Sequence, residues 1–255
     1  MSQSPVPGRD TAYVWIGRGV GGRPAPAGLL LRRAGATLLG RAEDEIVVRH
    51  GRDGRPLVAV CGAGARVELP VSVSRSGPVV VVAARPGGPV GVDVERCRPL
   101  PARELARRWY APTEAAWLAG RPADGQAADF LRLWTAKEAV GKALGVGLRD
   151  GGLRRRMPVP DGPGALRRPG FADGGGWLRP VPGVANLCVG HPPVGGGLVL
   201  AVAVVAADGP TVEVVTVQVD VAGNVDGAAR RSGHVAAVRN ASTERTSLPV
   251  VVRGN

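Results

Sequence analysis

The chain has 255 residues, 44% apolar and 21% charged, which is enough for the core of one domain or of two small ones. A longest apolar run of ten residues excludes a membrane-spanning helix, which needs roughly 20. Three separated cysteines argue against a disulfide framework, and without a secretion signal we expect a cytoplasmic protein. The net charge of +12 predicts an anionic partner: a nucleic acid, an anionic cofactor or an acidic protein surface.

The first part of the chain is expected to contain one helix and several strands after a Gly- and Pro-rich segment, residues 1–28. Hydrophobic spacing and turn residues predict a strand at 12–16, a helix at 29–39, and strands at 45–49 and 57–60. Residues 79–84 and 90–95 predict two more strands, which the Pro-Gly turn at 85–88 would join as a hairpin.

The strand at 90–95 has a strict alternation of side chains. Valines at 90, 92 and 94 alternate with Gly91, Asp93 and Glu95. Because successive side chains of a strand point to opposite faces, the valines are expected in the core and both carboxylates on the other face.

The second part of the chain is richer in helix. We expect a basic helix at 101–110, a short helix that Thr113 caps with Glu114 in its first turn, and an amphipathic helix at 130–144. Residues 198–206 and 211–221 predict a closing hairpin. After about residue 222 the apolar pattern fades, and we expect a disordered tail over 222–255.

Lysine is rare in this chain: 31 of the 33 basic residues are arginine, and the two lysines are Lys137 and Lys142. A phosphate in a tight pocket would favour the compact ammonium of lysine, whereas chance clustering is the alternative. Lys137 falls in the middle of the apolar stripe of the helix at 130–144. Its ammonium would either extend past its neighbours to water or meet an anion at the edge of the core.

Glu138 lies on a different face of that helix, about 100° from Lys137, with Lys142 one turn later. If this face meets Asp93 and Glu95, three carboxylates converge with two cations. Three oxygen donors with open coordination positions are typical of Mg²⁺ that binds substrate phosphates. The alternatives are a solvent-facing Glu138–Lys142 ion pair and an edge strand whose polar residues face water.

Two segments resemble the signatures of the 4′-phosphopantetheinyl transferases. Residues 91–95, G-V-D-V-E, are similar to the pattern G-[IV]-D-x-E of that family. Residues 134–142, W-T-A-K-E-A-V-G-K, are similar to its pattern W-[ST]-x-K-E-[AS]-x-x-K. Their order and separation suit the larger monomeric class, which acts on carrier proteins of polyketide and non-ribosomal peptide synthases.

Weaker similarities lie at residues 54–56, 72–77 and 110–114. There the chain departs from the family pattern: Arg75 replaces a histidine that contacts the cofactor's phosphates, Ser72 an asparagine, and Arg55 a lysine. Because a guanidinium is a competent phosphate ligand, we expect cofactor binding to be retained.

The resemblance implies an α+β fold of two similar halves, residues 29–110 and 111–221, related by pseudo-twofold symmetry with a ligand cleft between them. It implies a reaction that moves the 4′-phosphopantetheine arm of coenzyme A to a serine of an acyl or peptidyl carrier protein and releases adenosine 3′,5′-bisphosphate. Coenzyme A would be the co-substrate and Mg²⁺ the cofactor.

The resemblance also implies roles for single residues. The ligands of Mg²⁺ would be Asp93, Glu95 and Glu138. The contacts to coenzyme A would be Arg55, Ser74, Arg75, Lys137 and Lys142, with the two lysines on the diphosphate. The serine proton would go to Glu138, to a water beside it, or to Glu114; an acid that only stabilises a helix N-terminus is the alternative for Glu114.

The basic surplus has a use in this interpretation, because carrier proteins of the family are typically acidic around the modified serine. Residues 98–108 and 149–168 are candidate docking segments, with plain solubility as the alternative. The competing class is an arginine-rich nucleic-acid-binding or non-catalytic binding protein. Only 4% of residues are aromatic, and no base-stacking pattern is found, so we expect no nucleic-acid partner. The resemblance to the larger monomeric class implies a monomer. A third possibility is a degenerate transferase that has lost coenzyme A binding.

Overall fold

The computed structural model describes residues 8–19, 23–51, 54–60, 68–149, 151–159, 178–205, 211–218 and 245–248. They form a mixed α/β fold. The helices are α1 (Ala27–Leu39), α2 (Ala102–Trp109), α3 (Pro112–Ala119), α4 (Ala123–Leu144) and the short 3-10 helices η1 (Glu43–Glu45) and η2 (Gly152–Arg154). No helix in these ranges has the length and apolar character needed to cross a membrane.

The strands form three sheets. The first has the order β12-β11-β1-β6-β5, made of β1 (Thr11–Arg18), β5 (Val71–Ser76), β6 (Val79–Ala84), β11 (Thr211–Gln218) and β12 (Arg245–Leu248). The second has the order β7-β10-β9-β8, made of β7 (Val90–Arg96), β8 (Arg179–Pro180), β9 (Leu187–Gly190) and β10 (Leu198–Val205). The small third sheet is β2-β3-β4, made of β2 (Ile46–His50), β3 (Pro56–Val60) and β4 (Glu68–Leu69).

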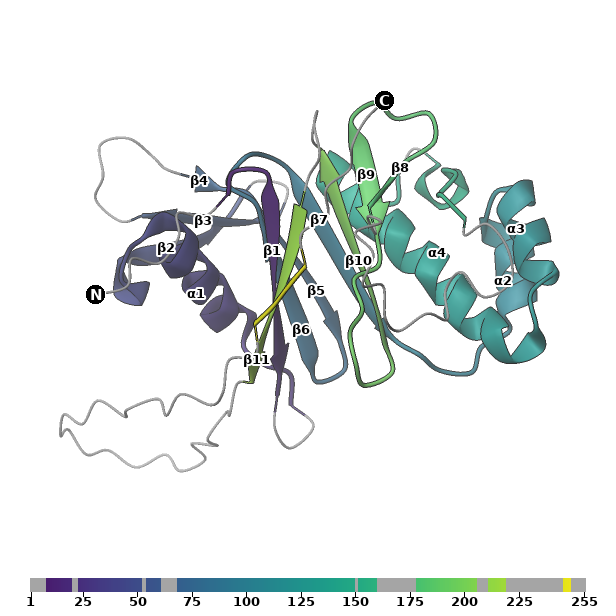
Figure 1. Ribbon diagram of the computed structural model, residues 1–255, viewed down its shortest axis with the longest axis horizontal. Helices are drawn as coiled ribbons and strands as arrows, with labels where there is room; N and C mark the ends of the chain where they lie inside the picture. The colour runs from purple at the N-terminus through teal and green to yellow at the C-terminus, as the bar shows by residue number, and fades with distance from the viewer. Residues whose placement is uncertain are drawn as a thin grey trace.

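Alternating side chains on the strands build four layers. One face of the first sheet packs on α1, where Val80 and Leu30 share a hydrophobic cluster. Its other face packs on the second sheet, where Val81 and Val92 share another cluster. The far face of the second sheet, with Ala201, packs on α4. Figure 1 shows α1 and α4 on opposite sides of the two sheets.

The two large sheets meet along their edge strands, β5 and β7, through serine hydroxyls. The Oγ atoms of β5 accept hydrogen bonds from backbone N–H groups of β7 at 3.1–3.2 Å: Ser72 from Val92, Ser74 from Val94 and Ser76 from Arg96. Backbone donors on an exposed strand edge otherwise lack a partner. The alternating serines of β5 therefore take the place of a neighbouring strand and fix β7 against the first sheet.

Most predicted elements are present. Helix α1 and the antiparallel pair β2–β3 lie where the sequence predicts them. Helix α4 begins at Ala123, seven residues before the predicted start. Apart from β12, the tail segment 222–255 lies outside the described residues, as do Cys61 and half of the loop 149–168.

Both predicted hairpins are wrong. Strand β6 pairs with β1 and β5, whereas β7 pairs with β10, so the turn between them carries the chain from one sheet to the other. Likewise, β10 belongs to the second sheet and β11 to the first, where β11 lies parallel to β1. The strands expected to pair edge to edge in each hairpin thus belong to different sheets.

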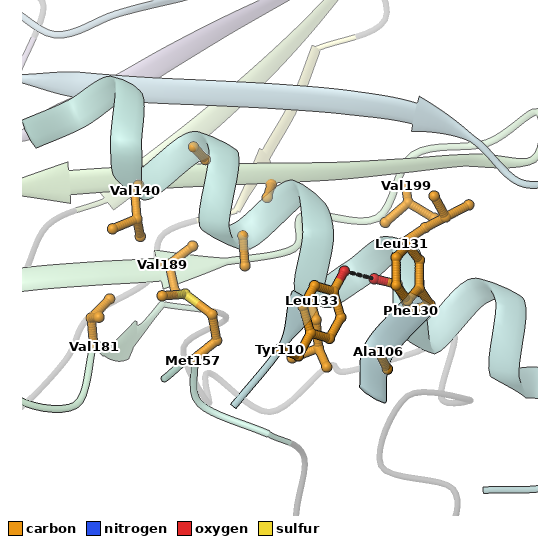
Figure 2. Close-up of a cluster of buried hydrophobic side chains, with 14 of the residues drawn as sticks. Ala106, Tyr110, Phe130, Leu131, Leu133, Val140, Met157, Val181, Val189 and Val199 are labelled. Carbon is orange, nitrogen blue, oxygen red and sulfur yellow. Dashed lines mark hydrogen bonds between the residues drawn. The ribbon is translucent and has the colours of Figure 1, made fainter. Parts of the chain in front are cut away.

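The cluster between α4 and the second sheet includes most of the aromatic side chains of α2 and α4. The Tyr110 ring stacks on Phe130 with centroids 4.8 Å apart, and its hydroxyl donates to the Phe130 carbonyl at 3.1 Å (Figure 2). The Trp134 ring is also stacked with Phe130, with ring centroids 6.3 Å apart. These contacts fix the first half of α4 against α2.

His191, just after β9, links the second sheet to α4. Its Nε2 lies 2.9 Å from the Arg132 carbonyl oxygen, and burial lowers its pKa to about 4. An unfolded histidine titrates near 6.5, so the unfolded chain binds the proton more readily and stability falls as the pH drops from about 6.5 toward 4. His191→Gln is expected to remove at most about 3 kcal/mol of this pH dependence, measured by urea unfolding at both ends of the window. An unchanged slope against pH would contradict this.

Candidate functional site

Strand β7 presents its polar side chains to α4. Its valines lie in the cluster between the sheets, and Gly91 touches α4: a Cβ there would lie 1.9 Å from the carbonyl oxygen of Ala139. Asp93 follows on the same face, so the predicted alternation is confirmed. The missing side chain at Gly91 lets α4 come close enough for its polar groups to reach Asp93.

Asp93 is the buried centre of this face, with 6% of its surface exposed. Its Oδ1 accepts hydrogen bonds from the Lys142 ammonium and from the Ser74 hydroxyl, both at 2.7 Å. Lys142 Nζ also donates to the Val92 carbonyl at 2.9 Å. Burial raises the pKa of Asp93, and Lys142 and Ser74 offset part of that rise. These hydrogen bonds hold the Asp93 carboxylate in place, but they do not fully compensate the loss of hydration that raises its pKa.

Glu138 belongs to the same electrostatic group. Its pKa is raised first by burial, then by the negative charges of Asp93 and Glu95, while Lys142 acts in the opposite direction. Like charges at close range disfavour ionisation of each other. Residues 93, 95 and 138 therefore form an acidic group, contributed by β7 and α4, that we call the acidic site.

Glu95 lies toward the outer edge of the acidic site. Its Oε2 accepts from the Arg98 guanidinium at 2.9 Å and lies 3.4 Å from Ser76 Oγ. Its side chain is more exposed than that of Asp93. Arg98 belongs to the segment 98–108 that the sequence predicts as a docking surface, and spacing alone does not reveal its contact to Glu95.

The donor chemistry of the acidic site suits Mg²⁺, which prefers carboxylate oxygens. Burial and the charge of Glu95 raise the pKa of Asp93, burial and the charges of Asp93 and Glu95 raise the pKa of Glu138, and Lys142 offsets only part of each rise. In the described ranges, however, no three His, Cys, Asp or Glu side chains are close enough to form a ready-made metal centre. The carboxylates are the ligand type that Mg²⁺ prefers, but in the present side-chain conformations they do not converge on a single point.

Lys137 and Glu114 are brought together elsewhere, in the core. Lys137 Nζ lies 2.9 and 2.7 Å from the two Glu114 oxygens, and the two residues are 0% and 2% exposed. Glu114 also accepts the backbone N–H groups of Ala111 and Met157. Burial lowers the pKa of Lys137, and Glu114 opposes that shift.

The roles that the resemblance implied for these two residues therefore need correction. Neither side chain reaches solvent, so the Lys137 ammonium offers no surface to a diphosphate and Glu114 none to a substrate hydroxyl. The anion that Lys137 meets is Glu114 itself. Thr113 does not cap α3 either: the N-cap is Ala111, whose N–H is satisfied by Glu114.

The remaining predicted contacts to coenzyme A lie at different distances from the acidic site. Ser74 is in direct contact with Asp93. Arg55 reaches the C-terminal end of α4, where its Nη2 would lie 2.5 Å from a Cβ at Gly145. Arg75 is exposed and pairs with Val80, whose side chain faces α1, so alternation places it on the opposite face of β5 from Ser74.

Ser74→Ala tests the link between the two sheets. The change removes a hydrogen bond to Asp93 and leaves the buried N–H of Val94 without its acceptor. We expect a loss of about 1–3 kcal/mol in the free energy of unfolding and a further rise in the pKa of Asp93. Urea unfolding and carboxyl titration by NMR measure the two effects, with the exposed Arg75→Ala as a control that should change neither. A stability equal to that of the wild type would show that the serine does not hold this edge.

Comparisons with known proteins identify one region. Residues 89–165 match the family model described as the 4′-phosphopantetheinyl transferase superfamily. The chain is 29% identical to the 4′-phosphopantetheinyl transferase gsp of Aneurinibacillus migulanus over 120 residues, 47% of each protein. It is 30% identical to a 4′-phosphopantetheinyl transferase of Bacillus subtilis over 120 residues, 47% of this chain and 50% of that one. It is 35% identical to Sfp of Bacillus subtilis (strain 168) over 77 residues, 30% and 34% of the two chains.

The chain spans about half the length of the curated relatives it matches, or less. The segment matched by the family model includes Asp93, Glu95, Glu138 and Lys142, whereas Arg55, Ser74 and Arg75 lie before it. The matched segment therefore contains β7 and α4, the two elements that build the acidic site.

Proposed function

We propose that this chain, whose residues 89–165 match the model of the 4′-phosphopantetheinyl transferase superfamily, transfers the 4′-phosphopantetheine arm of coenzyme A to a serine of a carrier protein. The reaction would release adenosine 3′,5′-bisphosphate and depend on Mg²⁺. One observation carries the proposal: Asp93 on β7 accepts a hydrogen bond from Lys142 of α4 at 2.7 Å, and the negative charges of Asp93 and Glu95 raise the pKa of Glu138 on the same helix. The family match favours this function over the arginine-rich nucleic-acid-binding alternative.

Asp93, Glu95 and Glu138 would hold Mg²⁺, with the half-buried Glu95 and Glu138 turning toward Asp93. When bound, the ion would neutralise the charge that develops on the diphosphate as the serine hydroxyl attacks. Lys142 has 28% of its side chain exposed, so its ammonium can bind a diphosphate oxygen while Val92 and Asp93 orient it. This division of roles agrees with the burial of each side chain.

Glu138, or a water beside it, is the base in this proposal, because Glu138 is the half-buried acid that α4 brings close to Asp93 and Lys142. It would take the proton of the carrier serine. Glu114 is left out of this step because it lies in the core, paired with Lys137.

The architecture proposed for the enzyme is two similar α+β halves, residues 29–110 and 111–221, with coenzyme A in a cleft between them. The layer order supports it, since each large sheet carries one long helix on its outer face (Figure 1). Strand β7 precedes residue 110 but belongs to the second sheet, and β11 follows residue 111 but belongs to the first, so the two halves would exchange strands.

The partner would be an acidic carrier protein. Helix α2 exposes Arg103, Arg107 and Arg108 close in sequence to the acidic site, and the net charge of +12 would speed the encounter with an acidic surface. A monomeric state and a cytoplasmic location stay predictions.

The test is incubation of the full chain with coenzyme A, Mg²⁺ and a panel of apo carrier proteins, followed by mass spectrometry of the carriers. The proposal predicts the mass increase of one phosphopantetheine on at least one carrier, absent without Mg²⁺. No mass increase on any carrier, combined with salt-dependent binding to DNA, would favour the nucleic-acid-binding alternative.

A further inference from the structure

The Glu95 carboxylate of the acidic site already holds a cation from its own chain. Arg98 turns back toward the end of β7, and its Nη1 donates to Glu95 Oε2 at 2.9 Å and to the carbonyl oxygen of Arg96 at 3.2 Å. The Ser76 hydroxyl donates to the same Glu95 oxygen at 3.4 Å. The Arg98–Glu95 contact is thus part of a small hydrogen-bonded group at the end of the strand.

The backbone around Arg98 fixes the start of its side chain. The Cys97 N–H donates to the Gly197 carbonyl at 2.7 Å, which ties the segment after β7 to the segment before β10. Pro99 follows Arg98, and the residue before a proline is restricted to extended conformations. The pair with Glu95 therefore costs less conformational entropy than a pair between two mobile segments.

Two of the three acids are neutralised by cations of this chain. Lys142 contacts Asp93 at 2.7 Å and Arg98 contacts Glu95 at 2.9 Å, so three carboxylates face two cations and the formal charge is −1. In the part of the chain that the structure describes, no three potential ligands converge. The contact to Arg98 is one reason, because it engages the Glu95 oxygen that a metal ion would need.

We propose that Arg98 competes with the divalent cation for Glu95 and so keeps the affinity of the acidic site for a free cation low. This inference rests on the metal site of the proposed function. Glu95 becomes a ligand only after its contact to Arg98 is broken. The diphosphate of coenzyme A supplies further oxygen ligands, so Arg98 is displaced more readily when cation and diphosphate bind together.

Arg98 is the cation that can leave. Its side chain is 56% exposed, so water can solvate the released guanidinium, and ion pairs this exposed contribute little to stability. Lys142 is 28% exposed and also donates to the Val92 carbonyl, so it stays beside Asp93. The competing interpretation is a surface ion pair that has no effect on cation binding.

Mn²⁺ is the probe, because it takes the same oxygen ligands as Mg²⁺ and its free concentration is measured by electron paramagnetic resonance. In the full chain without coenzyme A, Arg98→Gln should bind Mn²⁺ about three- to tenfold more tightly than the wild type, because the change removes a competitor and a repulsive charge. Arg96→Gln is the matched control. It removes the same charge from the opposite face of β7 and should change the affinity less than about twofold.

A double-mutant cycle assigns the effect to the pair. In the Glu95→Gln protein, where Arg98 has no carboxylate to hold, adding Arg98→Gln should change the Mn²⁺ affinity less than about twofold. Equal affinity in Arg98→Gln and the wild type, including no binding in either, would overturn the inference. An equal gain in Arg96→Gln, or a full gain in the Glu95→Gln background, would also overturn it.

Transfer to a carrier protein is measured separately, so the two proposals can fail independently. Tighter Mn²⁺ binding by Arg98→Gln in a chain that modifies no carrier would support the competition and contradict the proposed function. Mg²⁺-dependent transfer with an Mn²⁺ affinity that Arg98→Gln leaves unchanged would support the function and overturn the competition.

Discussion

Asp93→Asn is expected to lower phosphopantetheine transfer roughly a thousandfold or more while the protein stays folded. Asp93 is the buried member of the acidic site and the group that holds both Lys142 and Ser74 by hydrogen bonds at 2.7 Å. The amide keeps the size of the carboxylate but removes its charge, and with it the attraction for Mg²⁺ and for the ammonium. The measurement is the initial rate of mass increase on the carrier protein.

Asp129→Asn is the matched control for this experiment. Asp129, which lies on α4, is likewise a buried carboxylate and pairs with Arg121 and Arg132 at 2.7 and 2.9 Å. It takes no part in the acidic site. Its change should lower stability and leave the rate per folded molecule unaltered. If the Asp93 variant transfers within tenfold of the wild type, the acidic site is not where the reaction occurs.

Lys137→Met has the largest expected effect on stability, a loss of about 3–5 kcal/mol in the free energy of unfolding. The change leaves Glu114 buried at 2% exposure with backbone donors but without its ammonium partner. Lys137 also donates to the Arg155 carbonyl and lies 4.8 Å from the Tyr110 ring centroid, so several contacts are lost together. Urea unfolding of the full chain measures the loss.

The double variant Lys137→Met/Glu114→Gln separates the pair from its surroundings. Because removal of both charges leaves no uncompensated carboxylate, we expect it to be more stable than Lys137→Met alone. If Lys137→Met keeps wild-type stability but loses affinity for coenzyme A, the lysine is a phosphate ligand, as the resemblance implied, and the buried pair does not describe the protein in solution.

The alternation in residues 90–95 was sufficient to predict which face of β7 carries the acids. Side-chain direction in a strand is a local property, so valines in the core required no knowledge of the rest of the chain. The helical spacing of Glu138 and Lys142 was local in the same way. These two patterns together predicted that β7 and α4 meet through their polar side chains, and the hydrogen bond from Lys142 to Asp93 joins the two elements there.

The predictions that were wrong concerned contacts between residues far apart in the sequence. A Pro-Gly turn at 85–88 looks the same whether it joins paired strands or carries the chain between sheets, and nothing local shows which edge β7 will pair with. Lys137 was placed in the apolar stripe, but its partner Glu114 lies 23 residues earlier on another helix. The serines at 72, 74 and 76 are a visible period-two pattern, and their role appears only once β7 lies beside them.

In the proposed enzyme, the acids of β7 and α4 bind a divalent cation together with the diphosphate of coenzyme A. Calorimetry of the full chain with coenzyme A, in Mg²⁺ and in chelator, tests it most directly. We predict at least tenfold tighter binding in Mg²⁺, and no such dependence in Glu138→Gln. Equal affinity of the wild type with and without Mg²⁺ would contradict the account.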